Sequence, residues 1–428
     1  ETFEPIRSYI WRVLTDQQGR IWFSTSGGDG AYVYDGRNVT HYTTRNGLGT
    51  DYLSGGLYED RGGGVWFGSG SAGGVSRFDG EGFTHLTTAD GLIDDRITAF
   101  AEDRQGRMWF GTRSGVSRFD RESWRSSSAD SADLRLHSDS ADLTDLQFTH
   151  FTAADGLCRS GVNSAIEDQQ GYLWFATGSG VSRFDGENFT CFTTADGLSH
   201  NHVRDIMEDH QGHLWFSTFG GGVSRYDGRV FQSLLQRDGL VHNGVHEVIE
   251  GRDGSYWIAT EGGLTRFRPR ISPPRIRITR IVAGRDFPPD APVRLPATQD
   301  YLAFEFQGSS FKTRPDQIAY VYRLDGYDAD WQVTREQQVV YRDLPMGEYL
   351  FQVQAVDRNL TYSTEPATVE VEVHLPYGQM ALWGLLGLAL VGVLVSGRVA
   401  LNRRRERDQA REALMLELEE ELQTAHDM

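Results

Sequence analysis

Cysteine is nearly absent from this sequence, which contains Cys158 and Cys191 alone among 428 residues. Disulfides are therefore not expected to hold the fold together, and we expect both thiols to be unpaired. A basic excess is also missing, because the formal net charge is -18. An acidic surface excludes the usual nucleic-acid-binding proteins, which present a basic face, so no nucleic-acid partner is expected.

Motifs for cofactors and metals are missing as well. The glycines belong to hairpins and do not form a phosphate-binding loop between a strand and a helix. No Cys/His spacing of a metal site occurs. We therefore expect no cofactor, no metal site and no catalytic residue in this chain.

What the sequence does contain is a repeat centred on tryptophan. The stretch Met108–Asp120, MWFGTRSGVSRFD, predicts two short strands joined at residues 113–115. Successive copies are separated by 44, 43, 65, 41 and 42 residues, and their tryptophans are Trp22, Trp66, Trp109, Trp174, Trp215 and Trp257. No helical apolar period occurs between them. A period of about 42 residues made of short strands predicts a β-propeller with one four-stranded blade per copy.

Each copy carries the same turn residues. Asp103, Gly106 and Trp109 recur at the same offsets in the first five copies, whereas Gly251 replaces the Asp in the sixth. An Asp that bonds its own turn, followed by a Gly with positive φ, explains the first two positions. Outer strands such as Phe83–Leu86 are followed by an Asx-Gly-Leu turn, for example Asp90–Leu92.

The number of blades is left open between six and seven. The 65-residue interval contains an insertion, 121–147, that is rich in Ser, Ala and Asp and is expected to be a flexible excursion. The sixth copy lacks an outer strand after Phe267. Residues Glu1–Ile6 could supply that strand, or a seventh blade could precede Glu1. We predict that residues 1–270 form the propeller.

A second β region is predicted over residues 271–376. Five runs alternate apolar and polar residues and are separated by turn clusters: Arg275–Val282, Tyr301–Phe306, Ile318–Leu324, Tyr349–Val356 and Thr368–Val373. About a hundred residues with short alternating strands predict an Ig-like β-sandwich.

The C-terminal part differs in kind. Residues Met380–Ser396 contain no charge and, at ~1.5 Å per residue, extend about 26 Å as a helix, so residues 377–401 predict one transmembrane helix. Trp383 marks one interface and Arg403–Arg405 the other, which predicts a cytoplasmic C-terminal side. Residues 402–428 predict a helix that can pair as a coiled coil in a homodimer, and its lack of a cap suggests that the segment is truncated.

These residues resemble a known family. The units WFGTxxGVSRFDG, with DGL between them, are similar to the two-component-regulator propeller repeat. Residues Tyr320–Tyr327, Tyr341 and Leu344–Tyr349 resemble the three-tyrosine domain that follows such propellers in bacterial membrane sensors, with Met346 where a second Pro is usual. The resemblance implies an all-β sensor region outside the inner membrane, periplasmic or extracellular, a single membrane pass and a cytoplasmic output, either a histidine kinase or a stage-II-sporulation-type phosphatase. The tail Glu421–Met428 is more similar to the lead-in of such a phosphatase.

Candidate ligand residues lie in the loops after Gly-Leu, which repeat symmetry places on one face. The third residue after each Leu is polar, and His residues on the fifth and sixth blades break the period. The predicted ligand-binding set is His200, Asn201, His202, His242, Asn243 and His246. The alternative interpretation is that the short polar residues cap the turn into the next strand.

Three functions are weighed on this basis. The first is a receptor fragment that senses a small molecule or, by family resemblance, a glycan. The second is a surface-anchored carbohydrate-active enzyme with His200 or His202 as general base, which needs a partner acid that the sequence does not identify. The third is a protein-binding propeller. The order propeller, sandwich, apolar helix and charged helix favours the receptor.

Overall fold

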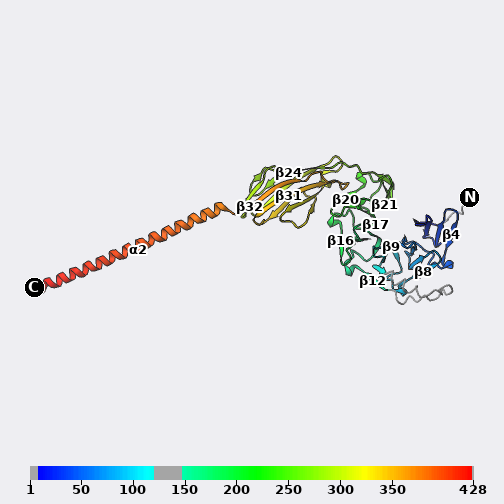
Figure 1. Ribbon diagram of the computed structural model, residues 1–428, viewed down its shortest axis with the longest axis horizontal. Coiled ribbons are helices and arrows are strands. Elements are labelled where there is room, and N and C mark those ends of the chain that lie inside the picture. Colours follow the sequence, from blue (N-terminus) through cyan, green and yellow to red (C-terminus); the bar gives the residue numbers. More distant parts are fainter. Residues whose placement is uncertain (1–7, 120–146, 427–428) are drawn as a thin grey trace. The chain divides into compact units, whose positions relative to one another are not determined.

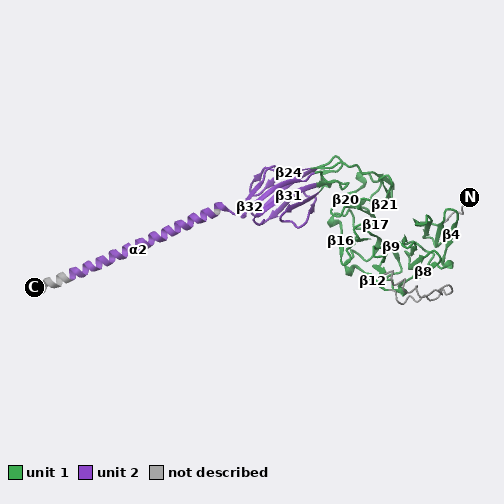
Figure 2. Ribbon diagram, viewed as in Figure 1, with its two compact units in different colours: residues 1–275, 309–319, 355–364 green, residues 276–308, 320–354, 365–428 purple. Residues whose placement is uncertain are grey.

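The structure is a computed structural model that describes residues 8–119 and 147–426. The chain divides into two compact units (Figure 2). The first comprises residues 1–275, 309–319 and 355–364, and the second comprises residues 276–308, 320–354 and 365–428. Two of the sequence predictions, the strand Glu1–Ile6 and residues 121–146 of the insertion, lie outside the described residues.

The first unit contains six antiparallel sheets of consecutive strands (Figure 1). The first sheet contains β1 (Ile10–Thr15), β2 (Ile21–Thr25), β3 (Ala31–Tyr34) and β4 (Val39–Tyr42). The second contains β5 (Leu57–Glu59), β6 (Val65–Gly68), β7 (Val75–Phe78) and β8 (Phe83–Leu86). The third contains β9 (Ile97–Glu102), β10 (Met108–Thr112), β11 (Val116–Phe119) and β12 (Phe148–Phe151). The fourth contains β13 (Val162–Glu167), β14 (Leu173–Thr177), β15 (Gly180–Phe184) and β16 (Phe189–Phe192). The fifth has four strands, β17 (Val203–Glu208), β18 (Leu214–Thr218), β19 (Val223–Tyr226) and β20 (Phe231–Leu234). The sixth has three strands, β21 (Val245–Glu250), β22 (Tyr256–Thr260) and β23 (Gly263–Phe267). The predicted hairpin of residues 108–120 is confirmed over its described part, residues 108–119.

The six sheets are propeller blades because their innermost strands share one channel. Its lining comes from β1, β5, β9, β13, β17 and β21 or from residues next to them, and the channel volume is about 230 Å³. The seams between blades are aromatic. Trp109, on the third blade, packs against Phe175 and Phe184 of the fourth, with ring centroids 5.9 and 5.6 Å apart. Burying such large side chains is the main stabilisation of the seams.

The first and sixth blades do not cover each other as the others do. Trp257 is only partly buried, whereas the other five repeat tryptophans are at most 2% exposed. On the first blade Trp11 and Val13 are 51% and 59% exposed, and on the sixth Leu264 is 60% exposed. The part of the chain that the structure describes contains six blades, one for each predicted repeat.

The outer strand β20 is mostly buried, whereas the outer strands β4, β12 and β16 have no buried residue. Segments 309–319 and 355–364, which belong to the same unit, lie against its blade. Gln232 Nε2 donates to the carbonyl of Val356 at 3.1 Å, and the Tyr362 hydroxyl donates to Asp227 Oδ2 at 2.7 Å.

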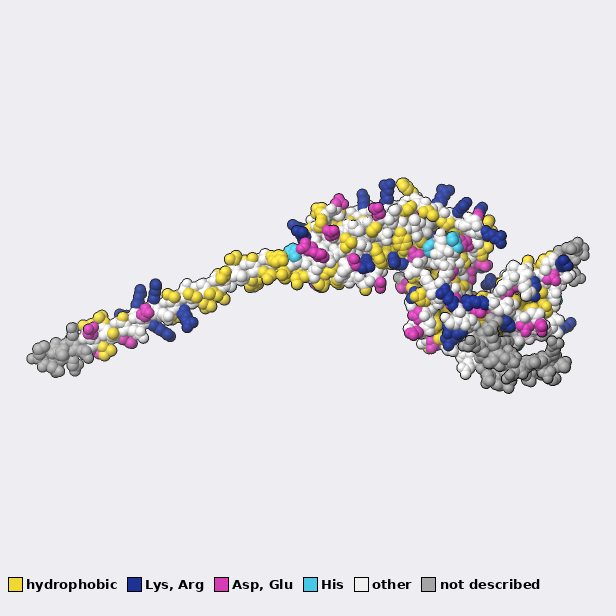
Figure 3. All heavy atoms as spheres, in the orientation of Figure 1, with side chains coloured by type: hydrophobic (Ala, Val, Ile, Leu, Met, Phe, Trp, Pro, Cys, Tyr) yellow, Lys and Arg dark blue, Asp and Glu magenta, His cyan; other side chains and the backbone are white. Residues whose placement is uncertain are grey.

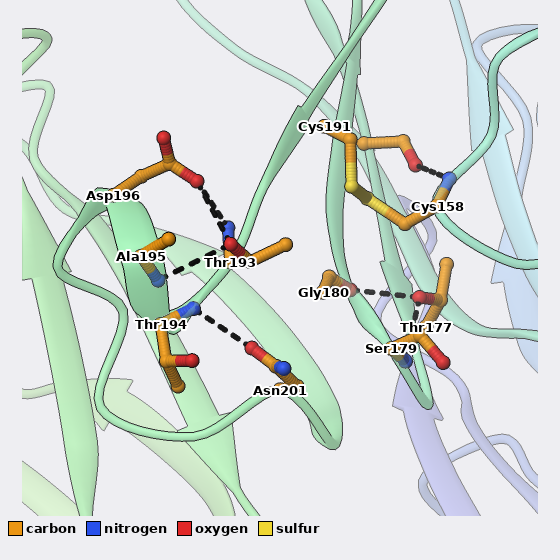
Figure 4. The surroundings of a disulfide bond; sticks show 11 residues. Cys158, Thr177, Ser179, Gly180, Cys191, Thr193, Thr194, Ala195, Asp196 and Asn201 are labelled. Carbon is orange, nitrogen blue, oxygen red and sulfur yellow. Dashed lines mark hydrogen bonds between the residues drawn. A yellow bond between two sulfur atoms is a disulfide. The ribbon is translucent and has the colours of Figure 1, made fainter.

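The prediction that both cysteines are unpaired is wrong. Cys158 and Cys191 form a disulfide with a Cα–Cα distance of 5.3 Å (Figure 4). It ties the loop that enters the fourth blade to the outer strand β16. Repeat symmetry explains the contact: at the equivalent loop position Gly49 lies so close to His85 that an added Cβ would be 1.9 Å from the His Nδ1. Cys158 and Cys191 occupy these two adjacent positions, which the spacing in sequence did not reveal.

The second unit contains two packed sheets with the orders β25-β24-β27-β30 and β26-β32-β31-β28-β29. The strands β24–β28 are Arg275–Val282, Asp286–Phe287, Val293–Pro296, Tyr301–Ser309 and Ala319–Asp325, and β29–β32 are Gln332–Thr334, Gln338–Arg342, Gly347–Val356 and Ala367–His374. Phe304 and Phe351 stack between the sheets with centroids 3.8 Å apart. The five strands predicted from alternation all occur, and the β-sandwich is confirmed.

The helix α2 runs from Tyr377 to His426. It contains one candidate membrane span within Met380–Glu419, with a mean hydropathy of 2.1 in its most apolar window and none of that window buried. Figure 3 shows its hydrophobic side chains as a continuous band followed by basic ones. Trp383 is 72% exposed, so this helix is not a core element of the β units.

Candidate functional site

The loop that enters the fifth blade carries the first three predicted residues. Thr193 caps a short 3-10 helix, Thr194–Asp196, and Gly197 ends it with φ 105. Asn201 Oδ1 accepts the backbone N–H of Thr194 at 2.8 Å. His200 Nδ1 accepts the backbone N–H of His202 at 3.0 Å. Asn201 and His200 therefore hold the loop together.

The loop that enters the sixth blade repeats this arrangement. Asn243 Oδ1 accepts from Gln236 N at 2.6 Å, and His242 Nδ1 accepts from Gly244 N at 2.9 Å. Asp51 and Asp95 bond their own loops in the same way. The turn-capping interpretation is thus confirmed for both Asn residues. The two His rings form the corresponding caps through Nδ1.

His202 belongs to an aromatic and cationic group on the same blade. Its ring stacks on Phe219, with centroids 5.2 Å apart and planes 9° apart. The guanidinium carbon of Arg204 lies 4.4 Å from the centroid of Phe219. Burial, followed by the Arg204 charge, lowers the pKa of His202. Phe219 is nevertheless 50% exposed, so a cation, an imidazole and an accessible aromatic face are held together.

Arg204 also joins this group to the sixth blade. It donates to Glu261 Oε1 at 2.7 Å and lies 3.2 Å from His246 Nδ1. The hydrogen bond from Arg204 lowers the pKa of Glu261. His242 Nδ1 is 3.8 Å from Glu261 Oε2. Four of the six predicted residues, His200, His202, His242 and His246, thus lie at or beside one bridge between two blades.

The bridge adjoins the central channel, because Arg204 and His246 immediately precede two channel residues on their strands. These are Asp205 on β17 and Glu247 on β21. Ser164 donates to Asp205 Oδ1 at 2.8 Å. Burial raises the pKa of Asp205 to about 6, the charge of Glu247 adds to the rise, and the Ser164 bond and the Arg12 charge oppose it.

We name this set the channel mouth: His202, Arg204, Asp205, Phe219, His246, Glu247 and Glu261. It offers hydrogen-bond donors and acceptors of both charges beside an exposed aromatic ring, which suits a polar ligand with an apolar face. Among residues 8–119 and 147–426, no group of three or more His, Cys, Asp or Glu could hold a metal ion.

Sequence reasoning missed Arg204, Phe219, Glu261 and the channel carboxylates. A signal was available in the inner strands of the fifth and sixth blades, which have two ionisable residues in a row where the third blade has Thr98-Ala and the fourth has Asn163-Ser. The fifth reads Val203-Arg-Asp and the sixth Val245-His-Glu at the same repeat positions. Polar residues where a strand faces the axis of a propeller indicate a functional channel rather than packing.

Two family comparisons agree with the repeat analysis. The family described as two component regulator propeller matches residues 91–114 and 197–220. The family described as Y_Y_Y domain matches residues 312–374. The chain carries two-component regulator propeller repeats and a Y_Y_Y domain. The second propeller match contains His202, Arg204, Asp205 and Phe219 of the channel mouth. The resemblance in the sequence is confirmed.

Several solved structures are similar to the chain at low identity. The extracellular domain of BT3049 from B. thetaiotaomicron, named as a hybrid two-component system, is 22% identical with a TM-score of 0.46, over 86% of this chain and 56% of that one. The extracellular domain of BT4673 from the same organism, named as a one-component system, is 16% identical with a TM-score of 0.47, over 86% of this chain and 57% of that one. This chain therefore spans a little over half the length of these extracellular domains. Virginiamycin B lyase from Staphylococcus aureus is 15% identical with a TM-score of 0.46, over 62% of this chain and 86% of the lyase. No curated protein matches the chain.

Proposed function

We propose that this chain is the ligand-sensing region of a single-pass bacterial membrane receptor that relays to a cytoplasmic kinase or phosphatase. The observation that carries the proposal is the apolar part of α2. It follows a regulator propeller and a Y_Y_Y domain, and its most apolar window has no buried residue. An 18-residue apolar window without burial is the composition of a membrane span.

The charges flanking the span support its orientation. Arg403–Arg405 follow the apolar stretch, whereas the β units precede it. Because basic residues remain on the cytoplasmic side, residues 402–428 are cytoplasmic, and both β units lie on the periplasmic or extracellular side of the inner membrane. A disulfide between Cys158 and Cys191 fits that oxidising side.

The channel mouth is the ligand site in this proposal. Its exposed Phe219 and its charged bridge Arg204–Glu261 fit a glycan or another polar small molecule, and the remaining predicted residues, His200, Asn201, His242 and Asn243, shape the loops around it. The test is a glycan array probed with the labelled chain in nanodiscs. Retention on one glycan, lost in F219A and R204A but kept in the exposed-turn variant D185A, supports the site. Equal retention by F219A and R204A contradicts it.

Relay requires that the ligand binds two conformations of the receptor with different affinity. Ala410, Leu414 and Leu418 form one stripe of α2 at helical spacing, which supports a homodimer through this helix. Since both native cysteines are paired, Leu414→Cys introduces a single free thiol. We expect L414C to crosslink in membranes and Glu412→Cys, on the opposite face, to crosslink much less. Equal crosslinking at both positions contradicts the dimer.

A further inference from the structure

A second cavity lies at the seam between the fourth and fifth blades. It has a volume of about 180 Å³, and its lining includes Asp168, Gln170, Tyr172, Arg183, Leu214 and Tyr226. We name it the seam pocket. It shares no residue with the channel mouth, so a ligand bound in it is independent of the proposed function.

The neighbouring seam explains why this one is hollow. Between the fifth and sixth blades the hydroxyl of Tyr256 reaches across and donates to Asp209 Oδ2 at 2.9 Å. Tyr256 directly precedes Trp257 in its blade, and the residue that directly precedes Trp215 in the fifth blade is Leu214. Leu214 is shorter and has no hydroxyl, so the equivalent space beside Asp168 is left unfilled.

The charges around the seam pocket are also arranged differently from those of other blades. In the first three blades an arginine bonds the turn Asp, as Arg107 Nε does to Asp103 Oδ2 at 2.6 Å. The fourth blade has Tyr172 at the position of Arg107. Asp168 accepts hydrogen bonds from the indole of Trp174, at 2.7 Å, and from two backbone N–H groups.

Arg183 is the cation among the residues that line the seam pocket, and one of its nitrogen donors has no hydrogen-bond acceptor among the described residues. Its guanidinium carbon lies 4.7 Å from the centroid of the Tyr172 ring. Its Nε is buried without a hydrogen-bond partner among the described residues. A guanidinium with an unsatisfied donor is costly to bury, so a carboxylate that pairs with this guanidinium is favoured.

We propose that the seam pocket binds a small zwitterion of amino-acid size. Its volume corresponds to about six waters, since one water occupies about 30 Å³ in the liquid. A carboxylate end pairs with the Arg183 guanidinium, and an ammonium end meets Asp168, Gln170 and the aromatic faces. A ligand with one charge leaves the opposite side of the pocket unpaired, which is costly in a partly desolvated site.

Isothermal titration of the chain in nanodiscs tests the proposal with alanine, serine and valine, and with the matched fragments propionate and ethylamine. We expect at least one amino acid to bind at least tenfold more tightly than either fragment. Leu214→Tyr, which copies Tyr256, fills the pocket and abolishes binding without lowering the melting temperature. Arg183→Met also abolishes binding, whereas Leu214→Met, which conserves volume, retains it. Absence of binding for all three amino acids, propionate binding as tight as theirs, or undiminished binding by L214Y overturns the proposal.

Discussion

The indole Nε1 of Trp109 donates a hydrogen bond to Asp103 Oδ2 at 2.8 Å, six residues earlier. The same bond joins the turn Asp and the tryptophan in each of the first five blades, between 2.7 and 2.8 Å. The other oxygen of Asp103 accepts two backbone N–H groups of the turn. One carboxylate therefore fixes both the turn and the ring that fills the seam to the next blade.

Replacing this carboxylate is expected to destabilise the propeller strongly. Asp103→Ala leaves the buried indole N–H, two turn N–H groups and the Arg107 guanidinium without their acceptor, which predicts a loss of about 3 kcal/mol in the free energy of unfolding. Urea unfolding followed by tryptophan fluorescence measures it. Asp79→Ala removes an exposed turn carboxylate and serves as the control, with an expected loss below about 1 kcal/mol. Equal losses in both variants would contradict this role of Asp103.

The disulfide is expected to contribute measurably to stability. Cys158 and Cys191 are 33 residues apart, and closing a loop of that length in the unfolded chain corresponds to about 3–4 kcal/mol in the chain-entropy relation. The double variant Cys158→Ser, Cys191→Ser should unfold at lower urea concentration by that amount, and reductant should shift the wild type but not the variant. Labelling of two thiols in the unreduced, denatured wild type would show that the bond does not form.

Asp205 gives the channel a predicted pH signature. Its pKa in the folded chain is raised to about 6, so between about pH 4 and 6 the folded state holds a proton that the unfolded state has released. Stability from this group is therefore present at low pH and lost as pH rises through 6. A rise from 3.8 to 6 corresponds to about 3 kcal/mol, and we expect about 1–2 kcal/mol because water enters the channel.

Asp205→Asn removes this titration. The free energy of unfolding of the variant should equal that of the wild type near pH 4 and exceed it by about 1–2 kcal/mol at pH 7.5, as measured by urea unfolding at both pH values. The pKa values of Asp16, Asp60 and Asp209 are lowered, so their contributions are lost only as pH falls below about 4, and they cancel in the comparison. A constant difference between the two proteins at both pH values would contradict the assignment.

Tyr341 is expected to be the most sensitive hydroxyl of the Y_Y_Y domain. It donates to Asp328 Oδ2 at 2.7 Å, and Asp328 in turn accepts Leu324 N at 2.7 Å. Burial and this bond raise the pKa of Tyr341. Tyr341→Phe removes a bond to a charged acceptor and should cost about 2 kcal/mol in thermal unfolding of this domain. Tyr327→Phe, at a 49% exposed ring, should change stability by less than about 0.5 kcal/mol.

Much of the fold was predictable because the repeat and the alternation report backbone structure directly. The run Arg275–Val282 predicted β24 with its observed bounds, and Phe83–Leu86 predicted β8. The indole bond of Trp109 was not predictable in the same way. A fixed offset between Asp and Trp indicates a shared turn, but the direction of the side chains appears only when the strands are paired. The cysteine pair was missed because its contact depends on how a loop lies over an outer strand.

The candidate site was predictable in part. Period-breaking residues identified His202 and His246, which lie at one bridge. Their partners Arg204 and Glu261 are 57 residues apart and come from different blades, so no local pattern links them. The roles of His200 and His242 as loop caps also needed coordinates, since a His can cap a turn or face a ligand at the same position.

The most direct test of the receptor account is membrane topology. Because the native cysteines are paired, single thiols introduced by Arg37→Cys on an exposed turn of the first blade and by Gln409→Cys on α2 can be labelled selectively. The chain is expressed in a bacterial inner membrane, and spheroplasts are treated with a membrane-impermeant maleimide. The account predicts labelling of R37C in intact spheroplasts and of Q409C only after lysis. Labelling of both residues, or of neither, before lysis would contradict a single span between the propeller and the C-terminal helix.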